Sequence, residues 1–439
     1  MAACRKDSSI ITDTPNFPTP TVLIETGARG MVADEDGNAI EGATVILGQE
    51  VTTTNAYGYF EISGKTNAEQ PFVRIEKAGY FPSICNFTGR PGQFGRLKSI
   101  LRTKTLSGQI QAANGGEVQV SGGGSIEFKA GGFVNSSGQP YNGVVNVYAT
   151  YLDPTKPETM QMIPGSFRGT SLEGEDQVLV SYGMMNVLLE SPSGEKLQIN
   201  KPATLTTPIP SERLGDAPAT IPLWYIDEAT SVWKEQGSAI KQGNKYVGDV
   251  SHFSWWNFDI GIPVVNLSGK VVINGKSPFI RVKVTLTNGL AVSCLPDEAG
   301  YFSGGVPANE TFLFELIDEC NEVVYSGNLG PFSIDTEIGN ILVTLNSTWS
   351  TISGTLKNCE GEPVTNGIVF VTTATTSLSQ FPIIVNSDDG SFSGLIRACT
   401  ACRTFMALQR FPMSGKLMKH LTIVTGIWNY RSSLPGKLI

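Results

Sequence analysis

The chain has 439 residues, of which 48 are glycine, 25 are proline and 16% are charged, and its formal net charge at pH 7 is −8. This composition favours a turn-rich all-β protein over a helical one. The negative charge speaks against nucleic acid and anionic membranes as partners, because Lys and Arg clusters bind both. No apolar run is long enough to cross a bilayer. At about 150 residues per domain, the length predicts roughly three domains.

Residues 1–26 are predicted to form an N-terminal tether. Small residues precede Cys4, as they precede the lipidated cysteine of a bacterial lipoprotein signal. The charged and apolar regions of a complete signal are missing, so lipidation of Cys4 and an accidental resemblance both stay open. The Pro/Thr-rich run at 8–21 matches the spacer that an anchored surface protein needs after its lipid.

Short strands and turns follow over residues 27–103. Turns are predicted at Asp34–Gly37 and Asn55–Gly58, because glycine accepts the positive φ that such turns need. Strands separated by turns at intervals of about eight to twelve residues are typical of a β-sandwich. The acidic residues 34–36 lack the bidentate Glu of a calcium loop, so we interpret them as a hairpin turn.

The same order of strand, turn and strand recurs at 264–346 and at 347–402. The repetition predicts a row of small β-sandwich modules around a larger central β-domain. These segments resemble the carboxypeptidase regulatory-like domain, a transthyretin-like β-sandwich of the starch-binding-like fold group. The resemblance implies the fold and little about function. The residues that carry it are Gly30, Asp34, Gly37, Gly58-Tyr59-Phe60 and Gly79-Tyr80 in the first copy, and Gly269, Asp297 and Gly300-Tyr301-Phe302 in the second.

The central section, residues 104–263, alternates strongly between apolar and polar residues, with Val118 and Val120 facing inward. The glycines at 122–124 precede neither a helix pattern nor the Lys of a phosphate loop, so they predict a tight strand connection. A GG-x-V segment and the corner from Phe128 to Phe133 resemble a ZU5-type β-domain. The whole section, which ends in LWYIDEATSVWKEQG and HFSWWNFD, resembles the central region of large lipoproteins from Bacteroidetes-type bacteria. More remotely, it resembles the region around an HFS-type segment in cartilage intermediate layer proteins.

A tryptophan-rich stretch, Pro222–Asp259, ends this section and holds four of the six tryptophans. After Val250, strand alternation puts Trp and Phe on both faces, which predicts a strand covered on both sides at the joint with the second sandwich. His252 is interpreted as a hydrogen-bonded core residue rather than a catalyst. The shorter segments before it predict exposed ligand-contacting aromatics at Trp224, Tyr225 and Trp233.

The cysteines are candidates for structural disulfides. Cys294 and Cys320 are placed to pair across the second sandwich, and Cys359 is placed to pair with Cys399 or Cys402 in the third. Free buried thiols are the alternative. The single C-x-x-C at 399–402 has neither a second pair nor a nearby His, so no zinc site is predicted.

No catalytic residue, cofactor or metal is predicted. The chain has two isolated histidines and neither a G-x-S-x-G nor an H-E-x-x-H motif. Forty acidic residues always include some pair of carboxylates, but no motif selects one.

The tail, residues 403–439, contains no acidic residue, and its strand rhythm stops. It is a poor source for the further strands that the third sandwich needs. We interpret it as the product of a frameshift or truncated reading frame; a genuine basic extension is the alternative.

The sequence therefore predicts a non-catalytic, monomeric surface lipoprotein of a Gram-negative outer membrane. It would act as a structural or adhesive β-scaffold toward other surface proteins or glycans, with membrane contact only through its lipid. The alternative is a carbohydrate-binding surface protein that stacks exposed aromatics on sugar rings. An accessory region of a peptidase or glycosidase is a remoter alternative. Burial or exposure of the tryptophans separates the first two.

Overall fold

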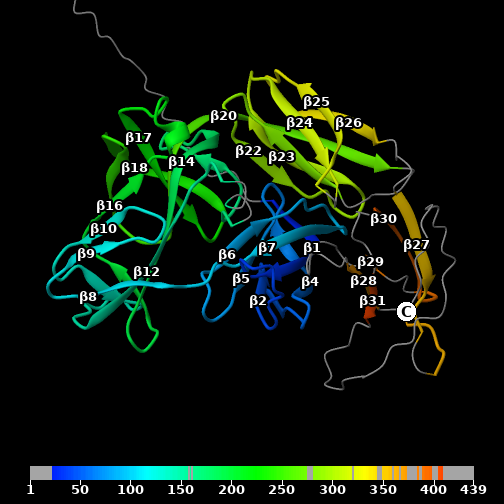
Figure 1. The fold of residues 1–439 in the computed structure, drawn as a ribbon, viewed down its shortest axis with the longest axis horizontal. Coiled ribbons are helices and arrows are strands. Elements are labelled where there is room, and N and C mark those ends of the chain that lie inside the picture. The colour runs from blue at the N-terminus through cyan, green and yellow to red at the C-terminus, as the bar shows by residue number, and fades with distance from the viewer. Residues whose placement is uncertain are drawn as a thin grey trace, which may run out of the picture.

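The computed structural model describes residues 22–156, 159, 162–273, 280–318 and 321–343, and shorter runs at 349–357, 360–364, 367–372, 383–384, 388–397 and 404–408. Nearly all of the regular structure in these residues is β-strand, arranged in several sheets (Figure 1). The predicted all-β fold is confirmed. No helix of the described residues is long and apolar enough to cross a membrane.

The first sandwich packs two sheets around one core. One sheet has the order β4-β1-β7 and the other the order β3-β2-β5-β6. Apolar residues at alternate positions, among them Val45, Phe60 and Val73, fill the space between them. Gly58 turns the chain into β4 at a φ of 70°, where a Cβ would overlap the carbonyl oxygen of Val32. The strands are β1 (Leu23–Ala33), β2 (Thr44–Leu47), β3 (Glu50–Thr53), β4 (Tyr59–Asn67), β5 (Phe72–Glu76), β6 (Ser83–Asn86) and β7 (Phe94–Ile100).

The middle domain is built on one long, curled sheet. Its main path is β11-β15-β14-β20-β17-β18-β19-β16-β10-β9, with β12 beside β14 and β8 beside β12. A 3-10 turn, η2 (Ser211–Arg213), follows β16. The strands are β8 (Leu106–Gln111), β9 (Gly116–Gln119), β10 (Ser125–Phe128), β11 (Phe133–Asn135), β12 (Val144–Leu152), β13 (Arg168–Thr170), β14 (Asp176–Glu190), β15 (Lys196–Ile199), β16 (Ala203–Pro208), β17 (Thr220–Asp227), β18 (Val232–Gln242), β19 (Lys245–Val250) and β20 (Trp255–Ile273).

Strand β13 closes part of this sheet into a ring. It pairs with β14 on one side and with β18 on the other, so β13, β14, β20, β17 and β18 enclose a small core. Trp224 fills this ring beside two glycines that leave room for its indole. A Cβ on Gly169 would lie 2.9 Å from the Trp224 ring, and one on Gly261 would lie 3.1 Å from it.

Strand β20 belongs to two units at once. Its first part pairs with β14 and β17 in the middle domain, and its second part pairs with β23 and β26 in the second sandwich. The facing sheet of the second sandwich has the order β22-β21-β24-β25. One continuous apolar core runs from the middle domain into this sandwich. The strands are β21 (Arg281–Thr285), β22 (Ala291–Cys294), β23 (Tyr301–Pro307), β24 (Phe312–Ile317), β25 (Val323–Leu329) and β26 (Thr336–Val343).

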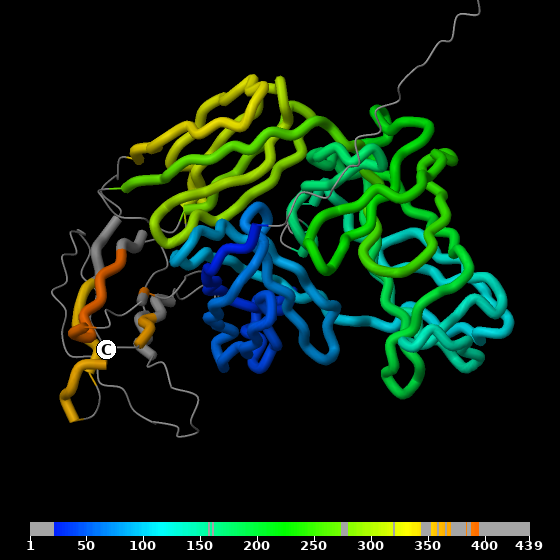
Figure 2. The backbone as a smooth tube through the Cα atoms, turned by 180° about the vertical axis from the view of Figure 1, so that it is seen from behind, coloured from blue at the N-terminus to red at the C-terminus, as the bar shows by residue number. Residues whose placement is uncertain are grey.

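This shared strand fixes the middle domain and the second sandwich relative to each other. The first sandwich lies beside both the middle domain and the second sandwich, and opposite views agree on this (Figures 1 and 2). The predicted boundary at residue 263 falls inside β20, where the strand continues without a break. The domain limits themselves stay a prediction.

Strands also occur in the C-terminal part of the described chain. β27 (Trp349–Thr355) pairs with β30 (Ser391–Arg397), and β28 (Ile368–Thr372) lies between β29 (Ile383–Ile384) and β31 (Thr404–Leu408). β31 belongs to the tail that we expected to be a poor source of strands, so for these residues that expectation is wrong. Five residues rich in apolar side chains suffice to extend a sheet. Residues 1–21, with Cys4, and 409–439 lie outside the described residues.

Candidate functional site

The tryptophans of the Pro222–Asp259 stretch lie in the core. Trp224, Trp233 and Trp256 have no exposed surface. Trp224 Nε1 donates a hydrogen bond to the Asp259 carbonyl at 3.0 Å, and Trp256 Nε1 donates one to the His252 carbonyl at 3.0 Å. The predicted exposure of Trp224 and Trp233 is therefore wrong. Ring closure by β13 covers the face of β17 and β18 that carries them.

The predicted two-sided burial of the following strand is confirmed. Trp255 packs into the core of the ring, whereas Trp256 packs into the larger core that continues into the second sandwich. Strand alternation produces this division, because neighbouring residues point to opposite faces.

Tyr225 and His252 form a half-buried pair beside this core. Their rings meet edge to face with centroids 4.6 Å apart, and Trp256 lies beneath both. Burial lowers the pKa of His252, so its imidazole is neutral at physiological pH. The ring is partly exposed, with Nδ1 3.4 Å from the Ser251 hydroxyl, rather than fully in the core. Ligand contact by Tyr225 stays a prediction.

A different set of polar residues joins the first and second sandwiches. Arg90 Nε lies 2.7 Å from Asp297 Oδ2, and its guanidinium lies over the Tyr301 ring at 3.9 Å. Asp297 is fully buried, whereas the Arg90 side chain is 34% exposed. The Thr88 hydroxyl adds a hydrogen bond to the Leu295 carbonyl at 3.3 Å. The turn of the second sandwich that begins at Asp297 therefore contacts the first sandwich.

Arg29 forms a second link across the same interface. It bonds Glu61 of its own sandwich at 2.7 Å and Glu298 of the second sandwich at 2.5 Å, and it stacks on Phe94. Burial opposes the charge of Arg29, but the carboxylates of Glu298 and Glu61 outweigh it and raise its pKa. The guanidinium therefore stays charged at this interface.

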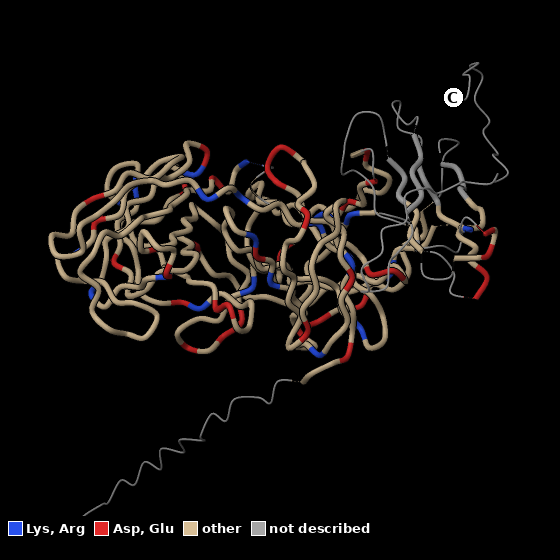
Figure 3. The backbone as a smooth tube through the Cα atoms, turned by 90° about the horizontal axis from the view of Figure 1, so that it is seen from below, with Lys and Arg blue, Asp and Glu red and all other residues tan. Residues whose placement is uncertain are grey.

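Ion pairs and hydrogen bonds also join the middle domain to the first sandwich. Arg74 pairs with Glu228 at 2.9 Å, and the Ser231 hydroxyl donates a hydrogen bond to Asn86 Oδ1 at 2.8 Å. The Gly165 N–H donates to the Ile84 carbonyl at 2.7 Å. Over the described chain, acidic and basic residues are interspersed (Figure 3).

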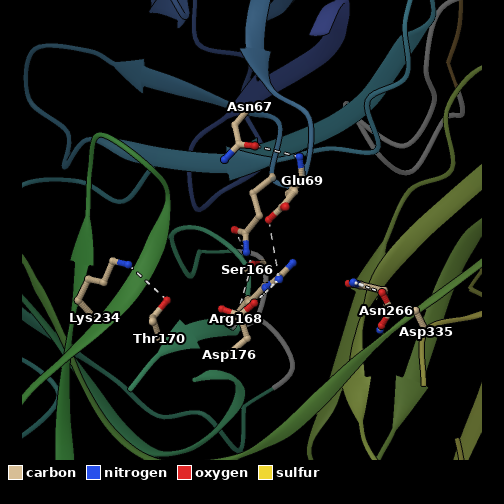
Figure 4. A network of polar contacts seen from close by, with 10 residues as sticks. Asn67, Glu69, Ser166, Arg168, Thr170, Asp176, Lys234, Asn266 and Asp335 are labelled. Carbon is tan, nitrogen blue, oxygen red and sulfur yellow. Dashed lines mark hydrogen bonds and ion pairs between the residues drawn. The ribbon is translucent and has the colours of Figure 1, made fainter. Parts of the chain in front are cut away.

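Arg168, on β13, stands where the three units meet (Figure 4). Its Nη2 lies 2.5 Å from Asp176 of the middle domain and 4.0 Å from Glu69 of the first sandwich. In the second sandwich, hydrogen bonds from Asn266 lower the pKa of Asp335, and the charge of Arg168 adds to this effect. One guanidinium therefore faces carboxylates of all three units.

A cavity of about 560 Å³ opens at this junction. Its walls are the inner faces of both sheets of the second sandwich, and its mouth is formed by loops of the first sandwich and by residues 163–168. Cys294 lies on the wall as a free thiol, and burial raises its pKa to about 12. This junction cavity is the candidate functional site, and no sequence motif pointed to it, because its residues come from segments far apart in the chain.

The predicted disulfides are not found among the described residues. Cys294 is a free thiol here, so its predicted bond to Cys320 is not formed in this structure. Cys320, Cys359 and Cys399 lie outside the described residues, and the pairing of Cys359 with Cys399 stays a prediction. Within the described part of the chain, no group of three or more His, Cys, Asp or Glu side chains is placed to hold a metal ion.

The fold defines the class: a protein of several β-modules, two of which share a strand and a core. No family model matches the chain. It is similar to the human cartilage intermediate layer protein 2, with 26% identity over 225 residues, which are 49% of this chain and 19% of that protein. It is also similar to the mouse protein of that name, with 30% identity over 107 residues, 24% of this chain and 9% of that protein. The chain thus spans less than a fifth of these relatives. This similarity agrees with the resemblance to cartilage intermediate layer proteins in the sequence; the carboxypeptidase regulatory-like and ZU5 resemblances stay predictions.

Solved bacterial structures with partial likeness to the chain include two pilins. The Bacillus anthracis TIE protein matches with a TM-score of 0.16 and 11% identity, over 74% of this chain and 50% of that one. BcpA, the major pilin subunit of Bacillus cereus, matches with a TM-score of 0.16 and 8% identity, over 73% and 99%. A streptococcal ancillary pilin matches with a TM-score of 0.17 and 7% identity, over 49% and 88%. At these TM-scores the likeness carries no argument about function.

Proposed function

We propose that the chain is a non-catalytic, exported scaffold whose β-modules act as one rigid body at the cell surface. The observation that carries the proposal is strand β20, which runs unbroken from the middle domain into the second sandwich. A strand with neighbours in both units removes the flexible linker that ordinarily permits domain motion. The module limits 27–103, 104–263 and 264–346, the monomeric state and the surface location belong to this proposal.

The first sandwich has no shared strand, so its rigid attachment depends on side chains. Arg29 and Arg90 both reach the loop that carries Asp297 and Glu298. Charged pairs with one buried partner fix orientation well, because misalignment leaves a buried charge without compensation. The three units would then present a fixed surface to other proteins, as an adhesive or structural component requires.

Distances between spin labels in the full-length chain test this rigidity. Val51 is 58% exposed on the first sandwich and Val323 is 51% exposed on the second, so each accepts a labelled cysteine without entering the core. A narrow distance distribution between the two labels supports the scaffold. A broad distribution, as flexibly linked domains give, would overturn it.

The lipid anchor is a separate part of the proposal. Incorporation of a labelled fatty acid into the exported protein, lost in Cys4→Ala and retained in Cys85→Ala, supports anchoring at Cys4. Equal labelling of the two variants contradicts it.

Carbohydrate binding has less support. Trp224 and Trp233 have no exposed ring face for a sugar, and Tyr225 is half-buried against His252. Absence of any signal on a glycan array from the folded protein agrees with the scaffold. Binding that disappears in Tyr225→Ala would favour the carbohydrate alternative.

A further inference from the structure

We propose that the junction cavity binds a small amphiphile: an apolar chain or ring with an uncharged or positively charged polar end. This activity goes beyond the scaffold role. The junction cavity has a volume of about 560 Å³, within the range of about 300–1,000 Å³ that is usual for small-molecule sites.

The walls of the cavity are apolar and come from both sheets of the second sandwich. Leu267 and Phe302 line it from β20 and β23, and Val284, Val292 and Phe314 line it from the facing sheet. β22 and β23 are the edge strands of these two sheets. The sandwich is therefore open along that edge, and a ligand that enters there contacts core side chains of both sheets. Burial of apolar surface favours binding, and smaller apolar cavities, of about 150 Å³, already bind hydrocarbons.

The mouth of the cavity is polar. Gln70 and Ser166 lie there and are held by a hydrogen bond from the Ser166 hydroxyl to Gln70 Oε1 at 3.2 Å. A site with an apolar interior and a few oriented polar groups at its opening matches an amphiphile better than a wholly polar ligand.

The charges at the mouth select the kind of polar end. Arg90 and Arg168 line the cavity, but Asp297 and Asp176 already pair with them. Glu69 and Glu337 also line it, which leaves an excess of negative charge. A carboxylate or sulfate end would meet repulsion there, whereas an ammonium or an uncharged hydroxyl would not.

The test measures binding of N-phenyl-1-naphthylamine, an uncharged dye that fluoresces in apolar surroundings, to the full-length chain. Val292→Trp places a large ring in the cavity, since Val292 is half-buried and lines it. Val323→Trp is the matched control, because it adds the same ring at an exposed position of the same sandwich. We expect wild type and Val323→Trp to bind alike, and Val292→Trp to bind at least about tenfold more weakly.

Competition identifies the polar end. Dodecyltrimethylammonium and dodecanol are expected to displace the dye, and dodecanoate is expected to need a concentration about tenfold higher. Equal displacement by dodecanoate would overturn the assignment of the polar end. Dye binding to Val292→Trp with unchanged affinity would overturn the site.

A second measurement guards against misfolding of the tryptophan variant. In a chain that keeps only Cys85 and Cys294, bound dodecyltrimethylammonium should slow alkylation of Cys294 by N-ethylmaleimide and leave Cys85 unaffected. Cys85 lies in the first sandwich and is not part of the cavity lining, so it serves as the internal reference. Alkylation of Cys294 at an unchanged rate contradicts the proposal. Val292 and Cys294 lie on the walls within the second sandwich, so these two outcomes test the cavity and the spin-label distances test the attachment of the first sandwich.

Discussion

Two turns of this chain have the same local structure and different surroundings. In the first sandwich, Asn55 Oδ1 accepts hydrogen bonds from the N–H groups of Tyr57 and Tyr59 at 2.9 and 3.1 Å. In the second sandwich, Asp297 Oδ1 accepts bonds from Ala299 and Tyr301, both at 2.9 Å. A glycine with positive φ follows three residues after each, with φ of 70° in the first turn and 89° in the second.

The two turns differ in the other terminal atom of the side chain, the one that does not accept the turn hydrogen bonds. Asn55 has an amide nitrogen there and its turn is exposed, whereas Asp297 has a carboxylate oxygen that pairs with Arg90 of the first sandwich. In the second sandwich the turn thus also forms part of an interface between modules. The local fold tolerates either residue, and the charge decides whether another module docks on it.

The largest difference is expected when each turn loses its side chain. Asp297→Ala leaves two turn N–H groups unpaired and Arg90 without its partner, so we expect the free energy of unfolding to fall by about 3 kcal/mol. Asn55→Ala removes exposed hydrogen bonds and should cost about 1 kcal/mol. Urea denaturation of the two variants and wild type measures both values. Equal losses would show that the docked turn has no special role.

Removing only the charge isolates the docking contribution. Asp297→Asn keeps an oxygen for the turn and deletes the ion pair with Arg90, for an expected loss of about 2 kcal/mol. If the loss comes from the pair, Arg90→Ala should destabilise wild type but cost little in the Asp297→Asn background, where the ion pair is already absent. A double-mutant cycle provides this measurement, and strictly additive losses contradict the pairing.

Another buried carboxylate, Asp259, has no ion pair with an arginine and should respond to pH. It is fully buried and neither oxygen has a hydrogen-bond partner, while the nearby Ser181 hydroxyl donates to Asn257. Burial raises the pKa of Asp259 well above its ordinary value of 3.8, and Ser181 and Arg213 oppose this only in part. The folded state therefore keeps a proton that the unfolded state has released.

Stability from this group is present at low pH and is lost as the pH rises toward the raised pKa of the folded state. The slope is at most about 1.4 kcal/mol per pH unit. Asp259→Asn removes this dependence, so its advantage over wild type should grow from about pH 4 upward. Urea unfolding at several pH values measures it, and parallel pH profiles of the two proteins would contradict a protonated Asp259.

The sequence predicted what local patterns control. Alternation after Val250 predicted the two-sided burial of Trp255 and Trp256, and glycines such as Gly58 predicted the turns, because both depend on neighbouring residues. The burial of Trp224 was not predictable in this way, since it depends on β13 closing the ring. The pair of Arg90 and Asp297 joins residues 207 positions apart. No local signal distinguishes an interface aspartate from a turn aspartate, so the junction cavity could not be predicted either.

The smallest effect is expected from the reverse exchange at Asn55 of the first sandwich. Asn55→Asp gives the first turn the same side chain that docks in the second, and its oxygen still accepts the two N–H bonds. Because Asn55 is exposed, the new carboxylate stays hydrated. The free energy of unfolding should therefore change by less than about 0.5 kcal/mol. A larger stabilisation in urea denaturation would mean that a carboxylate strengthens this turn without any docking partner. The larger stabilisation expected from Asp297 would then come from the carboxylate within its own turn and not from its ion pair with Arg90.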